Sequence, residues 1–370
     1  MKNGSFFIII FAALLALIAY CSVRGYQIIR PLPLACAYIS VFILMFASLI
    51  TGMMWGACFP PLIGKPLSLF GYSFVVVFVY LLIGFVFTDI FRLLNFGFRF
   101  VPPETMFAIR QWIFAGTLLV TATALIVGNY KFKHPKIVDL EITTEKTLQG
   151  RPVKMVMASD LHLGVTVDKK RLAKYVALIN EQQPDVVVFS GDVVDRDLTP
   201  LFEQRMYEEL RRIKAPLGVY AVTGNHEYIS GNMPKVEEFF EKSGFVLLRD
   251  SFCLVGNRFY LIGRDDYSNK QRKKLSDLVA GMDERKLRVL LDHQPNNLSE
   301  ARQNGVDLQL SGHTHYGQFF PINLIEKKIF ELPYGYKKTG ATHYYVSSGL
   351  GIWGPQYRIG TQSELVVIKL

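Results

Sequence analysis

Charged side chains are scarce in the first third of this sequence. Residues 1–130 carry seven basic and two acidic side chains, whereas residues 131–370 carry 34 basic and 29 acidic ones. Each part therefore contributes +5 to the net charge of +10. The second part is only mildly basic for its length. It also lacks zinc-knuckle spacing and any sustained basic and aromatic run, so we expect no nucleic-acid partner.

Cysteine is also scarce, with four residues in the chain. Cys21, Cys36 and Cys58 lie in apolar segments, where a free cysteine behaves as a small hydrophobic residue. Cys253 is alone in residues 131–370, which excludes a disulfide within that part and fits a reducing compartment.

Four long runs in the first part contain no charged residue. They are residues 6–23, 34–59, 67–88 and 111–130, which are 18 to 26 residues long. Because about 20 apolar residues cross a hydrocarbon core as a helix, the sequence predicts a four-helix transmembrane domain over residues 1–130. We expect the first helix to stay uncleaved, since no clear small-x-small site follows it. The missing charges argue against an ion or proton pathway.

Basic residues flank the four runs on both sides in equal number. The positive-inside rule therefore gives no direction from the counts. The cluster of Lys131, Lys133 and Lys136, together with the amino terminus on the same side, favours a cytoplasmic catalytic domain. We expect a multi-pass protein of the cell membrane, plasma or inner.

The remaining sequence has the pattern of an α/β domain. We predict a linker and first strand over residues 131–152 and a separate domain over residues 153–370, with helices at 168–183, 201–213 and 236–243. Five predicted strands are followed directly by Asp, Asn or His. Because strand ends in α/β folds gather ligand-binding groups at one rim, we expect these side chains to meet in one site.

The residues at these strand ends form short motifs. In order, the motifs are Asp160-x-His162, Gly191-Asp192-x-x-Asp195, Gly224-Asn225-His226-Glu227, His293 and Gly312-His313-x-His315. Carboxylate, amide and imidazole ligands together suit borderline divalent metals such as Mn, Fe or Zn. Burying such a cluster without metal would be costly. Asp195 and Glu227 either support the ligands or cap the loops.

This pattern closely resembles the calcineurin-like metallophosphoesterase family, over about residues 150–370. The resemblance implies a four-layer α/β/β/α sandwich and two metal ions. One ion would take Asp160, His162, Asp192 and His315, and the other would take Asp192, Asn225, His293 and His313. Two cations so placed bind phosphate oxygens and activate a water. His226 would stabilise the phosphate or protonate the leaving group, with Asp160 helping to orient it.

The end of the chain is similar to a membrane-associated branch of that family, which distantly resembles hydrolases that cleave the pyrophosphate of UDP-diacylglucosamine. The similarity rests on Gly312 to Gln318, Val346 to Gly351, Arg358, and the pair Glu364-Leu365. Arg358 is a candidate for binding substrate phosphate, with a surface salt bridge as the alternative. Tyr316 stands where that branch has glycine, and we expect it to reshape the substrate-binding rim. Residues 319–325 either pack in the core or form an apolar lip for an acyl chain.

These features predict a membrane-anchored, dinuclear-metal-dependent hydrolase that cleaves a phosphoester or pyrophosphate bond. A lipid-linked substrate, with membrane lipids as partners, fits the membrane part best. The alternative is a tethered phosphatase that acts on soluble nucleotides or phosphoproteins. A non-catalytic scaffold is disfavoured because the motifs have lost no ligand.

Overall fold

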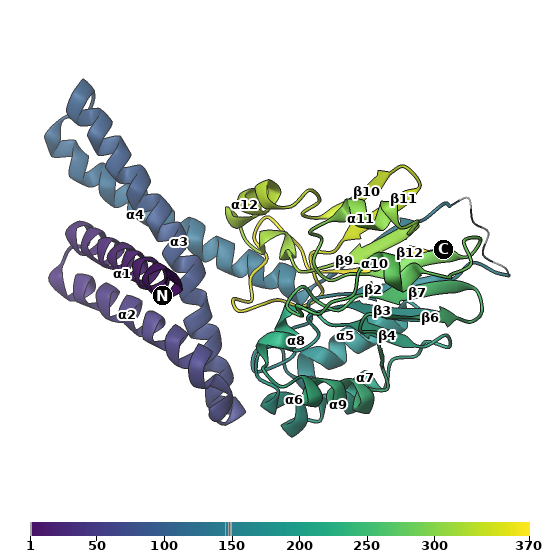
Figure 1. Cartoon of the computed structure of the whole chain (residues 1–370). Coiled ribbons are helices and arrows are strands. Elements are labelled where there is room, and N and C mark those ends of the chain that lie inside the picture. Colours follow the sequence, from purple (N-terminus) through teal and green to yellow (C-terminus); the bar gives the residue numbers. More distant parts are fainter. Residues whose placement is uncertain (1, 145, 147, 149) are drawn as a thin grey trace. The chain divides into compact units, whose positions relative to one another are not determined.

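The chain divides into two compact units, Met1–Val127 and Gly128–Leu370 (Figure 1). The computed structural model describes residues 2–144, 146, 148 and 150–370. The division falls three residues before the boundary expected at residue 130. It lies inside the fourth long helix, whose last residues, 128–133, belong to the second unit.

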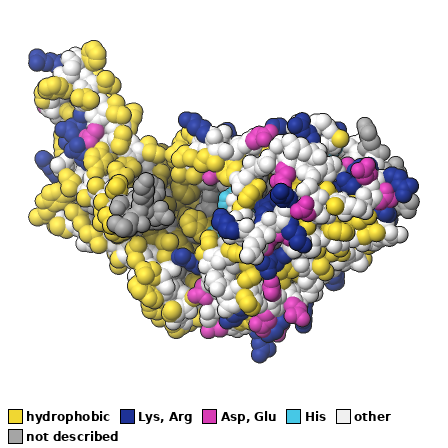
Figure 2. Space-filling model, viewed as in Figure 1, with side chains coloured by type: hydrophobic (Ala, Val, Ile, Leu, Met, Phe, Trp, Pro, Cys, Tyr) yellow, Lys and Arg dark blue, Asp and Glu magenta, His cyan; other side chains and the backbone are white. Residues whose placement is uncertain are grey.

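The first unit is built from long apolar helices. They are α1 (Lys2–Ile28), α2 (Leu32–Trp55), the short helix η1 (Gly56–Cys58), α3 (Pro61–Phe98) and α4 (Pro103–Lys133). The four long helices are long and apolar enough to cross a membrane, as predicted. Their outward residues are largely exposed hydrophobic side chains, as expected of helices in contact with lipid (Figure 2).

Helices α2 and α3 pack closely through a small residue. A Cβ added at Gly52 would lie 2.8 Å from the Cα of Ser68. In membranes such small residues let helix backbones approach, because packing rather than hydrophobic burial drives association. Asp89 is paired with basic residues of this unit: its Oδ2 lies 2.7 Å from Arg24 Nη2 and also accepts a hydrogen bond from Tyr20, and its Oδ1 lies 3.1 Å from Arg92 Nη1.

The second unit contains two six-stranded sheets. The first has the order β1 (Lys136–Glu141), β12 (Glu364–Lys369), β2 (Lys154–Ala158), β3 (Val186–Ser190), β4 (Val219–Val222) and β5 (Val246–Leu247). The second has the order β10 (Gly335–Thr339), β11 (Thr342–Val346), β9 (Leu308–Ser311), β8 (Leu287–Leu291), β7 (Phe259–Gly263) and β6 (Ser251–Val255). Strands β2, β3 and β4 are parallel neighbours, and so are β8 and β9.

Helices cover the outer face of each sheet, which gives the predicted four-layer sandwich. Met155 and Met157 of β2 face the core between the sheets, whereas Val156 and Ala158 face α5 (Lys169–Glu181) and α9 (Met233–Ser243). Helices α10 (Leu275–Val279) and α11 (Leu298–Gln303) cover the second sheet. Successive residues of a strand point to opposite faces of the sheet. Because both faces of β2 are buried, its sequence is almost continuously apolar.

Two local features differ from the sequence prediction. The helix expected over 201–213 is two short helices, α6 (Thr199–Glu203) and α7 (Met206–Leu210). They are separated at Arg205, which has a left-handed backbone with φ of 49°. Strands β5, β6, β7 and β10 were not predicted. Strand β5 has only two residues, and β6 and β10 have partly exposed, mixed residues that give no clear apolar run.

The end of α4 is part of the core of the second unit. Phe132 is fully buried, and the Arg171 guanidinium lies 5.0 Å from its ring centre. The backbone carbonyl of Gly128 accepts a hydrogen bond from Arg358 N at 2.9 Å, and Gln362 Nε2 donates to the carbonyl of Lys131. These contacts fix the last turn of α4 on the loop of residues 353–362.

Candidate metal centre

The predicted ligands lie together at the carboxyl ends of five strands. Asp160, Asp192 and Asn225 follow β2, β3 and β4, and Asn225 begins the short helix α8 (Asn225–Ile229). His293 follows β8, and His313 and His315 follow β9. The two sheets thus each supply one edge of the site, as the motif spacing suggested.

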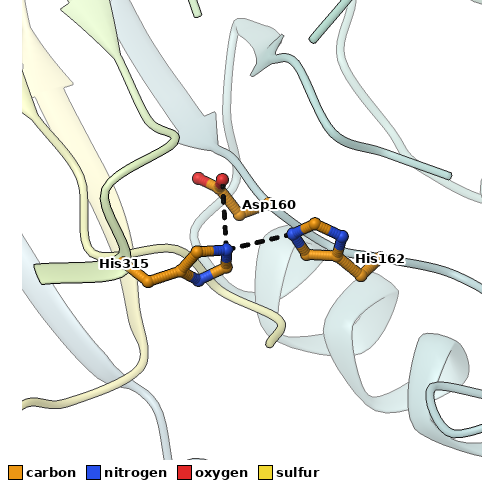
Figure 3. Close-up of side chains that lie close together, drawn as sticks. All are labelled: Asp160, His162 and His315. Carbon is orange, nitrogen blue, oxygen red and sulfur yellow. Dashed lines mark hydrogen bonds and ion pairs between the residues drawn. The ribbon is translucent and has the colours of Figure 1, made fainter. Parts of the chain in front are cut away.

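One cluster contains Asp160, His162 and His315 (Figure 3). The Nε2 atoms of the two imidazoles are 3.0 Å apart, and His315 Nε2 is 3.5 Å from Asp160 Oδ1. All three side chains are buried or nearly so, and the Nδ1 atoms of both histidines have no hydrogen-bond partner among the described residues.

A second cluster contains Asp192, His293 and His313. His293 Nδ1 lies 2.8 Å from the carbonyl of Ser190, to which it must donate. A neutral His293 therefore turns the lone pair of Nε2 towards Asp192 Oδ2, 3.2 Å away. Two lone pairs at that distance repel each other unless a cation or a proton lies between them. Asn225 lies beside this second cluster, with its Oδ1 2.8 Å from His313 Nδ1.

Asp192 connects the two clusters. Its Oδ2 lies 3.2 Å from His293 Nε2 and 3.7 Å from His162 Nε2, so one oxygen faces a ligand from each cluster. Its Oδ1 accepts a hydrogen bond from the backbone N–H of His226 at 2.8 Å, which fixes the carboxylate. This is the arrangement expected of a carboxylate that bridges two ions.

Burial decides the charge states of most of these groups. Burial lowers the pKa of His162 to about 3 and that of His313 to about 4, and it lowers the pKa of His315 well below its usual value. Burial, helped by nearby Asp192, raises the pKa of Asp160 to about 6. Burial would also raise the pKa of Asp192, but the charge of His293 holds it well below its usual value. His162, His313 and His315 are therefore neutral and have the protonation state of metal ligands, whereas Asp192 raises the pKa of His293 well above its usual value against the effect of burial.

The donor set fits divalent metal ions. Buried carboxylates and neutral imidazoles whose nitrogens lack hydrogen-bond partners are costly unless cations satisfy them. Nitrogen and oxygen donors in this mixture match Mn, Fe or Zn better than Mg or Ca.

His226 is held beside the first cluster by Asp195. Its Nδ1 lies 2.9 Å from Asp195 Oδ1, and its ring stands edge-on to His162 with centres 4.5 Å apart. Burial alone would lower the pKa of His226, but the hydrogen bond to Asp195 and nearby carboxylates raise it. The expectation that Asp160 orients His226 needs correction, because the carboxylate of Asp160 instead accepts the backbone N–H of His313.

Glu227 holds the ligand loops together. Its Oε2 accepts the backbone N–H groups of Asp192 and Gly224, and its Oε1 accepts that of Val194. Burial, followed by the charge of Asp192, raises its pKa to about 7. Of the two roles considered for this residue, the structure therefore shows support of the ligand loops.

Strained backbone is concentrated at the site. Asp160, His162, Asp192, His313 and His315 all have left-handed φ values between 48° and 72°. Each such residue costs about 1–3 kcal/mol, which the surrounding structure must offset, and such strain clusters at functional sites. Glycine relieves crowding beside the ligands: a Cβ at Gly191, which also has a φ of +84°, would lie 2.5 Å from His293 Nδ1.

Arg358 does not occupy the predicted substrate-contacting position. The side chain is fully buried, and its guanidinium donates to the carbonyls of His315, Gly349 and Gly351. Burial lowers its pKa to about 10, so it remains charged at neutral pH. With its donors engaged by backbone, Arg358 positions the loop of His315 rather than binding phosphate.

Two aromatic residues lie at the rim. Tyr316 is half-buried, with φ of 50°, and stacks on Tyr334 at 4.9 Å between ring centres. Trp353 is 47% exposed and stands edge-on to His226 at 6.2 Å. Sequence reasoning missed Trp353 because it lies in a loop without periodicity. Its only signal was its place between the Gly351 motif and Arg358.

A two-sheet α/β sandwich that holds paired His and Asp clusters at its strand ends defines a class of metal-dependent phosphoester hydrolases. Residues 153–317 match the family model described as "Calcineurin-like phosphoesterase". A Danio rerio protein named "Transmembrane protein with metallophosphoesterase domain" is 34% identical over 330 residues, covering 82% of this chain and 74% of its own. The chain belongs to the calcineurin-like phosphoesterase family.

Other similar proteins carry related names. A metallophosphoesterase of Aquifex aeolicus is 32% identical over 257 residues, covering 67% of this chain and 97% of its own. The crystal structure of a dimetal phosphatase from Danio rerio aligns with a TM-score of 0.30 and 15% identity, covering 54% of this chain and 88% of that one.

Proposed function

We propose that this protein is a membrane-anchored phosphoesterase that uses two divalent metal ions to hydrolyse a phosphoester or pyrophosphate bond in a lipid-linked substrate. The observation that carries the proposal is the position of Asp192 Oδ2, which faces His162 in one cluster and His293 in the other. Four helices able to cross a membrane precede this site in the same chain, which favours a substrate that resides in the membrane.

Asp160, His162, Asp192 and His315 would hold one ion, and Asp192, Asn225, His293 and His313 the other. Bound ions would supply neutralisation of phosphate charge and a water of lowered pKa. Asp195 raises the pKa of His226 against the effect of burial and so favours the protonated imidazole, which would donate a proton to the leaving oxygen. Tyr316, which stacks on Tyr334 at the rim, would border the substrate.

We also infer that the protein lies in the cell membrane with its catalytic unit in the cytoplasm. Lys131 and Lys133 stand in the last turn of α4, where cytoplasmic flanks carry an excess of basic residues. A reporter that is active only outside the cytoplasm, fused after Leu370, should remain inactive. An active fusion would reverse the orientation.

Metal content and substrate preference test the main proposal. The purified full chain should bind about two ions, and it should hydrolyse a diacyl lipid phosphomonoester in nanodiscs at least about ten-fold more efficiently than aryl phosphate or nucleoside monophosphate. Asp192→Asn keeps the acceptor for His226 N, so it should fold normally but lose about 10³-fold or more in rate on every substrate. A wild-type preference for soluble substrates would instead support the tethered phosphatase.

A further inference from the structure

The orientation of helix α12 (Ile322–Ile329) is the reverse of that expected for a helix in water. Leu324, Ile325 and Ile329 are 48%, 52% and 64% exposed, whereas the polar Asn323 is buried. Glu326, one turn after Asn323, is half-buried, and its Oε2 has no hydrogen-bond partner within the described part of the chain. Figure 2 shows hydrophobic side chains gathered over α12. The sequence left open whether this segment packs in the core, and the outward apolar side chains exclude that role for the helix.

Other helices of the same unit have the usual orientation. Helix α5 buries Leu172, Val176 and Ile179 against the sheet, and α9 buries Phe239 and Phe240. Large exposed apolar patches on folded proteins mark interaction surfaces. Helices α5 and α9 bury their apolar side chains within the unit. The outward apolar face of α12 is not buried there and therefore requires an apolar partner.

Helix α12 is attached directly to the metal site. A Cβ added at Gly317, two residues after His315, would lie 2.3 Å from the backbone nitrogen of Asn323. At the other end of the helix, the Phe330 ring stands edge-on to His313 with centres 6.1 Å apart. The helix therefore spans the rim between the two histidine ligands of the Gly312 motif.

The same rim carries further interfacial side chains. Phe320 and Trp353 are 45% and 47% exposed, and Trp353 stands against His226. Lys327 and Lys328 are exposed in the last turn of α12. Exposed Leu and Ile beside Trp and Lys is the composition of helices that lie in the interface of an anionic bilayer.

The occupant is indicated by the connection of α12 to α4. The backbone N–H of Phe320 donates to the carbonyl of Ile359 at 2.8 Å, and the neighbouring Arg358 N donates to the carbonyl of Gly128. A Cβ added at Gly128 would lie 2.8 Å from Ile359 Cγ1. One loop thus holds both α12 and the end of α4. The uncharged run of α4 ends at Tyr130, so a membrane crossed by α4 has its surface at this level.

We propose that the outward face of α12, with Phe320 and Trp353, docks on an anionic lipid bilayer and holds the opening of the metal site against the headgroups. The inference deepens the proposed function and rests on it for the substrate, because it places phosphorylated headgroups of that bilayer within reach of the site. Docking itself does not require hydrolysis.

Trp353 provides a direct test, since the chain has two other tryptophans, Trp55 and Trp112, both in the first unit. The Trp55→Phe/Trp112→Phe variant of the full chain is placed in nanodiscs that contain phosphatidylglycerol. Brominated phosphatidylcholine should reduce the remaining fluorescence by about two-fold, and acrylamide should quench it little. Fluorescence quenched by acrylamide but not by brominated lipid overturns the proposal. Protection from both quenchers would indicate a protein occupant and also overturns it.

A second variant separates docking from chemistry. Leu324→Glu/Ile325→Glu/Ile329→Glu should abolish lipid quenching of Trp353 and lower turnover of a lipid phosphomonoester by about ten-fold or more, with aryl phosphate turnover within about two-fold of wild type. Phe252→Glu/Leu254→Glu, at exposed apolar positions on strand β6, is the matched control and should change neither. Unchanged quenching in the α12 variant overturns the docking surface. If the wild-type protein fails to hydrolyse the lipid phosphomonoester but Trp353 is still quenched by brominated lipid, the proposed function is wrong and the docking surface stands.

Discussion

The hydrogen bond between Asp195 and His226 allows a sharp test of how the site works. Asp195→Asn replaces the carboxylate 2.9 Å from His226 Nδ1 with a neutral amide of the same shape. The side chains of His226 and Asp195 are only 11% and 19% exposed, so solvent screens the pair weakly. A hydrogen bond to a charged group contributes about 1.5–3 kcal/mol. If the bond serves mainly the transition state, its loss lowers kcat by about 10- to 150-fold.

The pH dependence should change in a defined direction. Asp195 raises the pKa of His226 against the effect of burial, so removing its charge lowers that pKa. Because His226 must be protonated to donate, activity should then be lost at lower pH on the alkaline side of the profile. A merely structural contact would reduce activity without moving this limb.

The assay combines aryl phosphate kinetics with metal analysis. Asp195 also lies close enough to His162 and His226 to form a metal-binding group with them. Unchanged metal content in Asp195→Asn is expected if Asp195 orients His226, and loss of metal would show that it is a ligand. Asp197→Asn, whose partner is the backbone N–H of Thr199 on the same loop, is the matched control and should behave as wild type. A normal kcat and pH profile in Asp195→Asn would refute the role assigned to the pair.

Three further predictions concern the ligand shell. Gly312→Ala should lower metal content and reduce activity by about 100-fold, because the added Cβ would lie 2.3 Å from Asp160 Oδ2. Gly116→Ala, where the added Cβ meets open space, is the control. Equal metal content in the two variants would show that a Cβ at residue 312 does not displace Asp160. Arg358→Ala removes the guanidinium donors from three buried carbonyls, of which those of His315 and Gly349 keep a backbone donor. It also empties the space of a fully buried side chain, so it should destabilise the second unit by about 3 kcal/mol or more, measured by thermal unfolding in detergent. An unchanged Tm would mean that the loop does not depend on Arg358. Chelation of the metal ions should lower the Tm of the wild type, and adding the ions back should restore it. If the ions are present at about 1,000 times their Kd, their removal lowers the free energy of unfolding by about 4 kcal/mol. An equal Tm with and without chelator would argue against resident ions.

Several features could be predicted from the sequence because they depend on local patterns. Four uncharged runs of sufficient length correspond to helices α1–α4, since crossing a membrane requires only length and apolarity. Strands β2 and β3 of the first sheet are buried on both faces, so they appear as apolar runs that are followed by Asp160 and Asp192. Order and spacing of these motifs carried the resemblance to the calcineurin-like family, and that resemblance implied the sandwich and the metal centre.

The orientation of individual side chains was decided by tertiary structure. Arg358 had been expected at the substrate, but three carbonyls from two separate loops enclose its guanidinium. Asp195, rather than Asp160, holds His226, because the loops after β3 and β4 lie side by side. Helix α12 turns its leucine and isoleucine outward, although its sequence suits a buried face equally well.

The sequence by itself therefore determined which chemical groups gather and that they follow a membrane anchor. These features depend only on residues that are neighbours in the sequence: the spacing of the motifs, and the length and periodicity of the apolar runs. Only the tertiary structure decided which oxygen faces which nitrogen, and which face of α12 is turned outward. Those outcomes depend on packing between segments as far apart as Gly128 and Ile359, and such contacts leave no local pattern in the chain.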